Sequence, residues 1–198
     1  MEKVKRSPKK VIEGLTRTRD LEALGWNRVA IGAMVNRGEL IRLGRGLYAP
    51  HDYEPSEHSS IAQVAIKCPD AVFCLLTALK LHGLTTQNPH EVWIAIDHKA
   101  NAPKIDYPPL RITRFSEAPA DDALEQMTVD GMVQIPVTSL ARTIVDCFKF
   151  RNKIGLDVAI EALREALETR RVGMDELYRQ SNLCRMQKVM RPYMEAMA

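Results

Sequence analysis

Apolar residues recur three or four positions apart in three short segments near the start of the chain, which is the spacing of one helix face. The predicted helices span 7–15, 18–25 and 27–38. Thr18 and Asn27 can cap the second and third helices, because their side-chain oxygens accept hydrogen bonds from free backbone N–H groups. Only Gly25 and Trp26 separate these two helices. A link this short predicts a helix-turn-helix.

The next segment, GELIRLGRGLYAP at 38–50, has the pattern of a β-hairpin. Polar and apolar residues nearly alternate on both sides of a turn formed by Gly44, Arg45 and Gly46. Glycine adopts positive φ angles at no steric cost, so both glycines favour a tight turn with Arg45 at its tip. Three helices followed by such a hairpin predict a winged helix, with the hairpin as its wing.

Strand and helix patterns in the remaining residues predict a mixed sheet of three or four strands covered by helices. Strands are expected at 91–97 and 109–115, and a hairpin at 127–138 around the Asp-Gly pair at 130–131. Helices are expected within 53–72 and at 77–83, 138–148, 156–171 and, once or twice, 174–197. Pro192 permits a break in the last of these.

The polar segment HDYEPSEH lacks periodicity, and we place the domain boundary there, between 1–52 and 53–198. The predicted fold class is mixed α+β. It consists of an N-terminal winged helix-turn-helix followed by an α/β domain with a small mixed sheet and C-terminal helices.

The composition is that of a folded globular protein, with 45% hydrophobic and 27% charged residues. The longest apolar runs, 72–76 and 92–96, are far shorter than the roughly 20 residues that cross a bilayer. Charged residues follow the basic start and interrupt any signal-peptide core, so we expect a cytoplasmic protein without a membrane segment. The four cysteines lack C-x-x-C spacing, which favours reduced, mostly buried thiols over a zinc site, and no cofactor is expected.

Positive charge is concentrated at the start of the chain. Residues 1–50 contain eleven Lys or Arg and five Asp or Glu, whereas the whole chain has a net charge of only +3. The remaining residues are therefore mildly acidic. A basic domain joined to an acidic one favours binding of nucleic acid through the basic part, with an anionic membrane surface as the less favoured alternative.

A helix-turn-helix reads DNA with the N-terminal residues of its second helix, which enters the major groove. We therefore expect Asn27 and Arg28 to lie nearest the base edges. Basic residues farther along are expected to contact phosphates: Arg37, Arg42 and Arg45. Trp26 and Val29 are expected in the hydrophobic core rather than at the DNA.

An enzyme that processes nucleic acid is the alternative class of function. Asp97 and Lys99 follow a predicted strand in the D-x-K arrangement of metal-dependent nuclease sites, and Glu91 is the available second carboxylate. A polar loop, with His98 as part of it, is the favoured interpretation. His82 is expected to cap a helix or to be partly buried.

Two further patterns are expected to be structural. Arg142 and Asp146 are four residues apart on a predicted helix, where they can form an ion pair worth about 0.2–0.5 kcal/mol. Thr138 and Ser139 precede them and complete a polar cluster. A stripe of methionines is expected to pack in the core: Met186, Met190, Met194 and Met197.

Three segments resemble the AbiEi family, the antitoxins of type IV toxin–antitoxin systems. The pattern DLEALGWNRVAIGAMVNRGELIRLGRGLYAP at 20–50 is similar to the winged helix of that family. LLTALKLHGLT at 75–85, followed by VWIAID, and IPVTSLARTIVDCF at 135–148 are similar to later segments. Leu140 stands where many members have a proline.

The resemblance implies a DNA-binding antitoxin that is not an enzyme and that represses its own operon. It implies two kinds of partner. One is double-stranded operator DNA, bound at inverted repeats by a homodimer, and the other is a nucleotidyltransferase-like toxin encoded beside the antitoxin.

Overall fold

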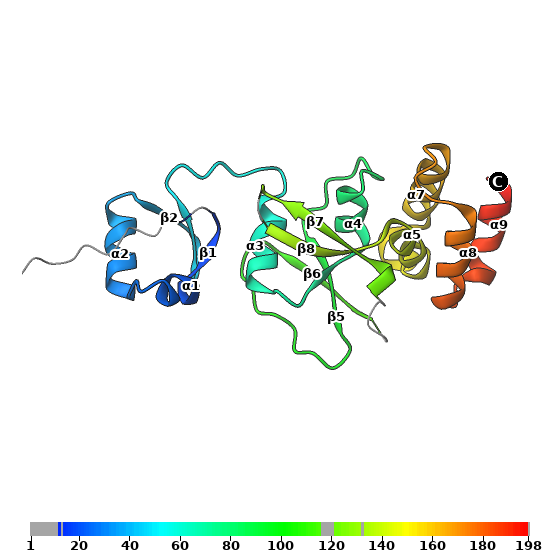
Figure 1. Ribbon diagram of the computed structural model, residues 1–198. Coiled ribbons are helices and arrows are strands. Elements are labelled where there is room, and N and C mark those ends of the chain that lie inside the picture. The colour runs from blue at the N-terminus through cyan, green and yellow to red at the C-terminus, as the bar shows by residue number, and fades with distance from the viewer. Residues whose placement is uncertain (1–11, 13, 116–120, 132, 198) are drawn as a thin grey trace, which may run out of the picture.

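The computed structural model of the 198-residue chain describes residues 12, 14–115, 121–131 and 133–197. These residues form two separate β-sheets and a set of helices, which confirms the mixed α+β class (Figure 1). The first sheet lies within residues 16–50 and the second within residues 72–138.

Two helices and a three-stranded antiparallel sheet make up the N-terminal unit, residues 14–50. The elements are β1 (Thr16–Arg17), α1 (Thr18–Ala23), α2 (Arg28–Asn36), β2 (Leu40–Gly44) and β3 (Leu47–Pro50), and the strand order is β1-β3-β2. Four buried side chains form its core: Leu21, Ile31, Met34 and Leu40. The predicted helix-turn-helix and hairpin are both present.

One prediction for this unit is wrong, and another falls mostly on residues that the structure does not describe. Thr18 is the first residue of α1 rather than its N-cap; Arg17 is the N-cap, because pairing with Leu47 holds it in the extended conformation. The helix expected at 7–15 lies mostly outside the described residues, and residues 12, 14 and 15 are not helical.

The second sheet is mixed and has five strands, in the order β6-β5-β4-β8-β7. The strands are β4 (Val72–Phe73), β5 (Val92–Asp97), β6 (Leu110–Phe115), β7 (Leu124–Val129) and β8 (Val133–Thr138). The predicted count of three or four strands is wrong, because β4 has only two residues and therefore no detectable alternation. The predicted Asp-Gly turn is correct: Asp130 and Gly131 have φ angles of 53° and 78°.

Helices cover both faces of this sheet. They are α3 (Ser59–Lys67), α4 (Leu75–Leu81), α5 (Leu140–Lys149), α6 (Arg151–Ile154), α7 (Leu156–Glu168), α8 (Met174–Leu183) and α9 (Gln187–Ala196), and a 3-10 turn spans Asp121–Ala123. Pro192 lies inside α9 and does not break it. The break falls between α8 and α9, where Arg185 has a φ of +59° and Met186 N–H bonds back to Ser181.

Alternate residues of β5 belong to two hydrophobic cores. Trp93 and Ala95 pack in a core with α4, α5 and the C-terminal helices, whereas Val92 and Ile94 pack in a core with α3 and β8. This follows from the two-residue period of a strand, which sends neighbouring side chains to opposite faces. Three of the four C-terminal methionines are buried in the first core and Met197 packs against it, so the predicted core stripe is confirmed.

Candidate nucleic-acid interface

The start of α2 is capped as predicted, and Asn27, Arg28 and Val29 are exposed there. Asn27 Oδ1 accepts a hydrogen bond from Ala30 N–H at 2.8 Å, which satisfies one of the free donors of the first turn. Gly25, with a φ of +95°, lets the chain turn from α1 into α2. Trp26 is half-buried against the small core, as expected.

Arg28 and Val29 extend into solvent from the first turn of α2. The Arg28 side chain is 82% exposed, and its Nε donates to Glu22 Oε1 on α1 at 3.0 Å. Val29 is 81% exposed, so the expectation that it belongs to the core is wrong. The buried face of α2 is defined by Ile31 and Met34, and a residue two positions before Ile31 lies on the opposite side of the helix. The spacing of Val29 relative to Ile31 and Met34 was therefore enough to predict that Val29 is exposed.

The hairpin turn consists of Arg45 and Gly46. Gly46 has a φ of +70°, whereas Gly44 does not have a positive φ and instead ends β2 after a register shift. Of the two glycines expected to permit a tight turn, only Gly46 has a positive φ. Gly46 O accepts a hydrogen bond from Thr18 N–H at 3.0 Å, which ties the turn to the start of α1.

The three arginines predicted to contact phosphates differ in their hydrogen bonds within the protein. Arg37 makes two hydrogen bonds to Glu39, at 2.7 and 3.3 Å, and Arg42 Nε donates to Gly44 O at 3.4 Å. Arg45 is exposed and has no hydrogen-bond or ion-pair partner among the described residues. Its guanidinium has all five N–H donors available for a ligand.

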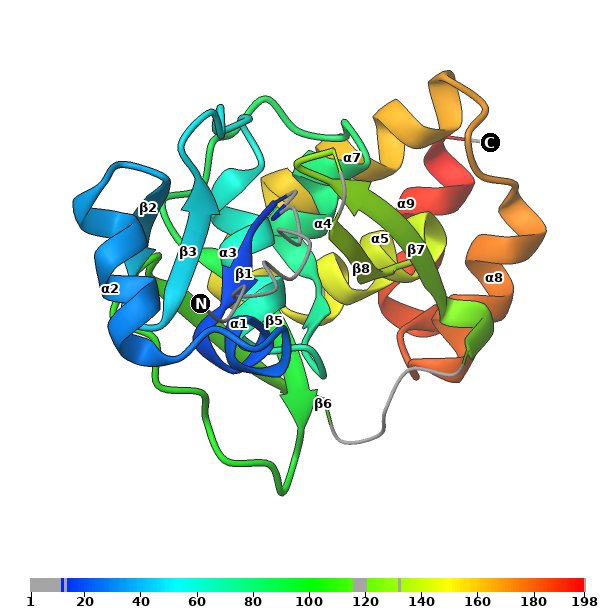
Figure 2. The ribbon, with the colours of Figure 1, turned by 60° about the vertical axis from the view of Figure 1, so that its left-hand side comes forward.

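The N-terminal end of α2 and the hairpin turn lie at the same end of the unit. The chain runs along α2, reverses, and returns along β2 to the turn (Figure 2). Asn27, Arg28 and Arg45 are thus brought to one end, whereas Arg37 is at the other end of α2. An exposed helix start next to a basic hairpin can bind a helical polyanion.

The D-x-K segment is not arranged as a metal site. Asp97 Oδ1 accepts a hydrogen bond from Lys99 N–H at 2.8 Å, as in a polar turn after a strand. Glu91 precedes β5 and Asp97 ends it, so about 20 Å of extended chain separates the two carboxylates. Within the described residues, no three His, Cys, Asp or Glu side chains come together as metal ligands would.

The polar cluster of α5 is buried. Arg142 Nε donates to Asp146 Oδ2 at 2.9 Å, with side-chain exposures of 11% and 0%, so the pair is not the weakly stabilising surface pair that was expected. Burial raises the pKa of Asp146 to about 6, although Arg142 opposes the rise. Ser139 is the N-cap of the helix, and the hydroxyl groups of Thr138 and Thr143 form a hydrogen bond of 2.7 Å.

His82 is buried at the end of α4, as expected of a capping histidine. Its Nε2 lies 2.8 Å from Thr138 O, and its own carbonyl accepts a hydrogen bond from Arg171. Burial lowers the pKa of His82, so the neutral ring is favoured. These contacts join α4, β8 and the end of α7, which is a structural role.

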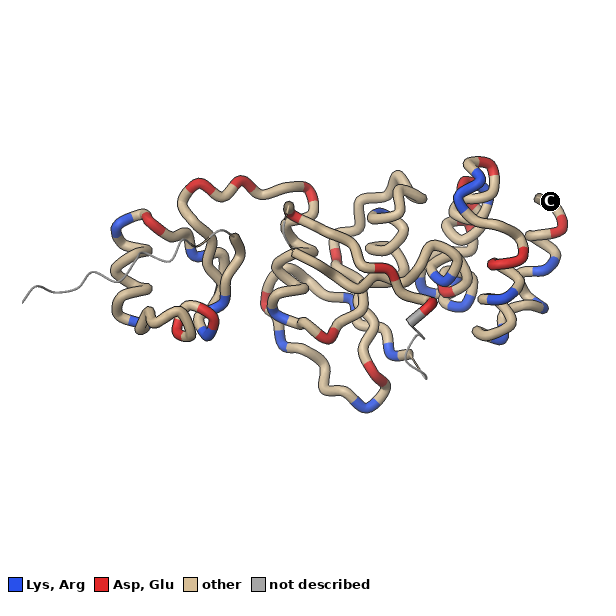
Figure 3. The backbone as a smooth tube through the Cα atoms, viewed as in Figure 1, with Lys and Arg blue, Asp and Glu red and all other residues tan. Residues whose placement is uncertain are grey.

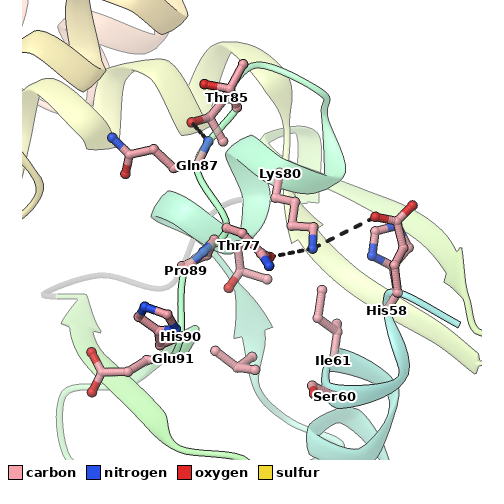
Figure 4. A pocket seen from close by; sticks show the side chains of 14 residues that line it. His58, Ser60, Ile61, Thr77, Lys80, Thr85, Gln87, Pro89, His90 and Glu91 are labelled. Atoms are coloured by element: carbon pink, nitrogen blue, oxygen red, sulfur yellow. Dashed lines mark hydrogen bonds and ion pairs between the residues drawn. The ribbon is translucent and has the colours of Figure 1, made fainter. Parts of the chain in front are cut away.

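A polar cavity of about 710 Å³ lies between α3, α4 and the segment that joins α4 to β5 (Figure 4). Lys80 donates a hydrogen bond to Asn88 Oδ1 at 2.9 Å and lies 3.9 Å from Glu57. The Thr77 hydroxyl accepts a hydrogen bond from Trp93 N–H at 2.8 Å. The lysine of this cavity therefore already interacts with polar neighbours.

None of the helices described is both long enough and apolar enough to pass through a lipid bilayer. All four cysteines are free thiols, three of them buried, as predicted.

Residues 14–51 match the family described as transcriptional regulator, AbiEi antitoxin. The matched segment contains β1, α1, α2 and the hairpin, and hence all five residues predicted to contact DNA. No curated protein matches the chain. The match agrees with the resemblance found in the sequence: residues 14–51 are similar to the transcriptional regulators of the AbiEi antitoxin family.

Proposed function

We propose that the protein is a DNA-binding repressor that acts as the antitoxin of a type IV toxin–antitoxin system and represses its own operon through a winged helix. The family match supports a role as transcriptional regulator and antitoxin. The observation that carries the DNA-binding part is the exposed start of α2 beside a turn whose arginine has no described partner. In this proposal residues 1–52 are the DNA-binding domain and residues 53–198 are the antitoxin domain.

In the proposed complex the first turn of α2 enters the major groove. Asn27 and Arg28 lie nearest the base edges, and Val29, now known to be exposed, can contact a thymine methyl group. Arg28 must leave Glu22 to do so. Breaking this ion pair costs little free energy, because an exposed ion pair contributes little to stability. Arg37, Arg42 and Arg45 contact phosphates, and Arg45 can also reach into the minor groove.

The proposed function also involves partner molecules and a cellular compartment. A homodimer binds inverted repeats in the operator, because a two-fold protein matches a two-fold site. A nucleotidyltransferase-like toxin is the target of the antitoxin domain, and both act in the cytoplasm. The function requires no catalytic step and no cofactor.

The test is binding of the full chain to the duplex upstream of its own gene, measured by gel shift across a salt series. Arg28→Ala and Arg45→Ala are compared with Arg191→Ala. Arg191 is a matched control, because it is an exposed helix arginine paired with Glu195 at 2.7 Å, as Arg28 is paired with Glu22, but it lies on α9.

We expect salt-sensitive binding that exceeds binding to unrelated DNA, with weaker binding in both α2 and hairpin variants and no change in the control. Equal, weak binding of both DNAs that neither variant alters would contradict the proposal.

A further inference from the structure

A cleft separates the hairpin of the N-terminal unit from the loop that joins β5 to β6. It has a volume of about 610 Å³, and its walls come from the hairpin turn, the end of α3 and residues 103–107. Figures 1 and 2 both draw this loop at the lower edge of the molecule, and Figure 1 draws α1 at the lower side of the N-terminal unit. Because Arg45 lines the cleft, the cleft adjoins the hairpin turn that is proposed to face DNA.

Basic side chains gather around this cleft from segments far apart in sequence. Arg17 and Arg45 come from the N-terminal unit, and Lys67 and Lys104 from the second unit. Figure 3 shows basic positions on both sides, where the two units come closest. Asp106 is the one acidic residue among the described residues that line the cleft. Such an excess of positive charge repels itself and favours an anionic ligand.

The basic side chains around the cleft differ in their ion pairs and hydrogen bonds within the protein. Arg17 lies 3.6 Å from Asp20, which partly neutralises it. Lys67 Nζ donates a hydrogen bond to Tyr107 O at 3.0 Å, and an ammonium group has two further donors. Lys104 is exposed and, among the described residues, has no ion-pair or hydrogen-bond partner. Lys67 and Lys104 can therefore both bind a phosphate without losing an internal contact.

Tyr107 adds a polar contact at the edge of the cleft. Its side chain is 61% exposed, although it is a large aromatic residue. A tyrosine hydroxyl donates to phosphate oxygens, as tyrosines do in protein–DNA interfaces. Two ammonium groups, a guanidinium and a phenol around an open cleft match the phosphodiester backbone of DNA.

We propose that this cleft is a second DNA contact, in which Lys67 and Lys104 of the second unit bind backbone phosphates that flank the hairpin. The inference rests on the proposed function and deepens it. The second unit thereby takes part in DNA binding and fixes how the N-terminal unit lies on the duplex. Because phosphates carry no base identity, these lysines add affinity without adding sequence preference.

The test measures the affinity of the full chain for the upstream duplex and for an unrelated duplex by fluorescence anisotropy, at several salt concentrations. The variants are Lys67→Gln, Lys104→Gln and the double variant. Lys67→Arg keeps the charge and should restore binding. Lys188→Gln is the control, because Lys188 is exposed on α9 at the far end of the molecule.

We expect the slope of log Kobs against log salt to become shallower by about 1 for each lysine removed, and by about 2 in the double variant. Affinity should fall equally for both duplexes, and Lys188→Gln should behave as the wild type.

If the wild type binds its upstream DNA and the double variant keeps the wild-type affinity and slope, the cleft does not bind DNA and the inference is overturned while the proposed function stands. If the wild type binds neither duplex, the proposed function fails and the inference fails with it.

Discussion

At the scale of single residues, Gly46 shows how backbone conformation constrains the hairpin. Its φ of +70° is one that other residues rarely adopt, and an added Cβ would lie 3.3 Å from the Thr18 hydroxyl. We expect Gly46→Ala to lower the free energy of unfolding by about 1–2 kcal/mol, measured by urea denaturation. Gly44→Ala is the control, because Gly44 lacks a positive φ and its Cβ would be in ordinary contact with Lys67 Nζ at 3.5 Å. Equal stability of the two variants would contradict this account.

Val29 allows DNA recognition and stability to be separated at one residue. Because Val29 is 81% exposed, Val29→Ala should change the free energy of unfolding by less than about 0.5 kcal/mol. Its affinity for the upstream duplex should fall, whereas affinity for unrelated DNA should not. Ile31, two residues later and 2% exposed, is the opposite case: Ile31→Ala should cost about 2–5 kcal/mol. Unchanged DNA affinity in Val29→Ala would exclude the thymine contact.

At the scale of elements, α5 contains a carboxyl group whose titration is coupled to folding. Burial raises the pKa of Asp146 to about 6, above the value of about 3.9 for an unfolded chain. Its contribution to stability is therefore fully present below pH 3.9 or so and is lost as the pH rises through about 6. Relative to Asp146→Asn, which cannot titrate, the wild type should lose up to about 3 kcal/mol over this range. Urea denaturation at a series of pH values measures this difference, and a difference independent of pH would contradict it.

The partner of Asp146 provides an independent measurement on the same helix. Arg142→Met leaves a buried carboxylate without its cation, which should cost about 3–5 kcal/mol at pH 7.5. The cost should be smaller at pH 5, because the carboxyl group is then protonated in the folded state. Arg191→Met is the control, since Arg191 forms an exposed ion pair at the same i,i+4 spacing on α9.

At the scale of the whole molecule, the segment between the two units is tied to the second sheet. Tyr53 donates a hydrogen bond to Asp130 Oδ2 at 2.5 Å, and Ser56 N–H donates to Asp130 Oδ1 at 3.1 Å. Asp130 is in the turn between β7 and β8. These bonds fix residues 53–56 against a turn that is 74–77 residues later in the chain.

We expect Tyr53→Phe to lower the free energy of unfolding by about 1 kcal/mol and to speed cleavage of this segment. Limited proteolysis with a glutamate-specific protease measures the second effect, because Glu54 and Glu57 are exposed there. Tyr107→Phe is the control, since the Tyr107 hydroxyl has no hydrogen bond within the part of the chain described. Equal cleavage rates in the two variants would show that the hydrogen bond between Tyr53 and Asp130 does not protect the segment.

Several elements were predictable because their signals are local. The cap at Asn27, the Asp-Gly turn at 130–131 and the cap at Ser139 each depend on contacts within four residues. β5 and β6 were predictable because alternation and apolar runs persist over six residues. In contrast, β1 and β4 have two residues each, too few for a period to be visible. Pairing with distant strands is what makes them strands.

The proposed DNA contacts divide in the same way. Arg28 and Arg45 could be chosen from a helix start and a turn, and the match at residues 14–51 involves the same segment. The exposure of Val29 could have been inferred from its spacing to Ile31. Lys67 and Lys104 carried no such signal, because nothing in the sequence places the end of α3 and the β5–β6 loop beside the hairpin.

The helix-turn-helix, the hairpin, the longer strands and the location of the basic charge could be predicted from local sequence, because these depend on propensity, periodicity and composition within short windows. Two features follow only from the tertiary structure: the burial of Arg142 and Asp146, and the cleft that lysines of the second unit line together with Arg45. Each of these depends on contacts between residues distant in sequence. The free energy of such contacts comes from burial and charge in the folded chain, which a local pattern does not contain.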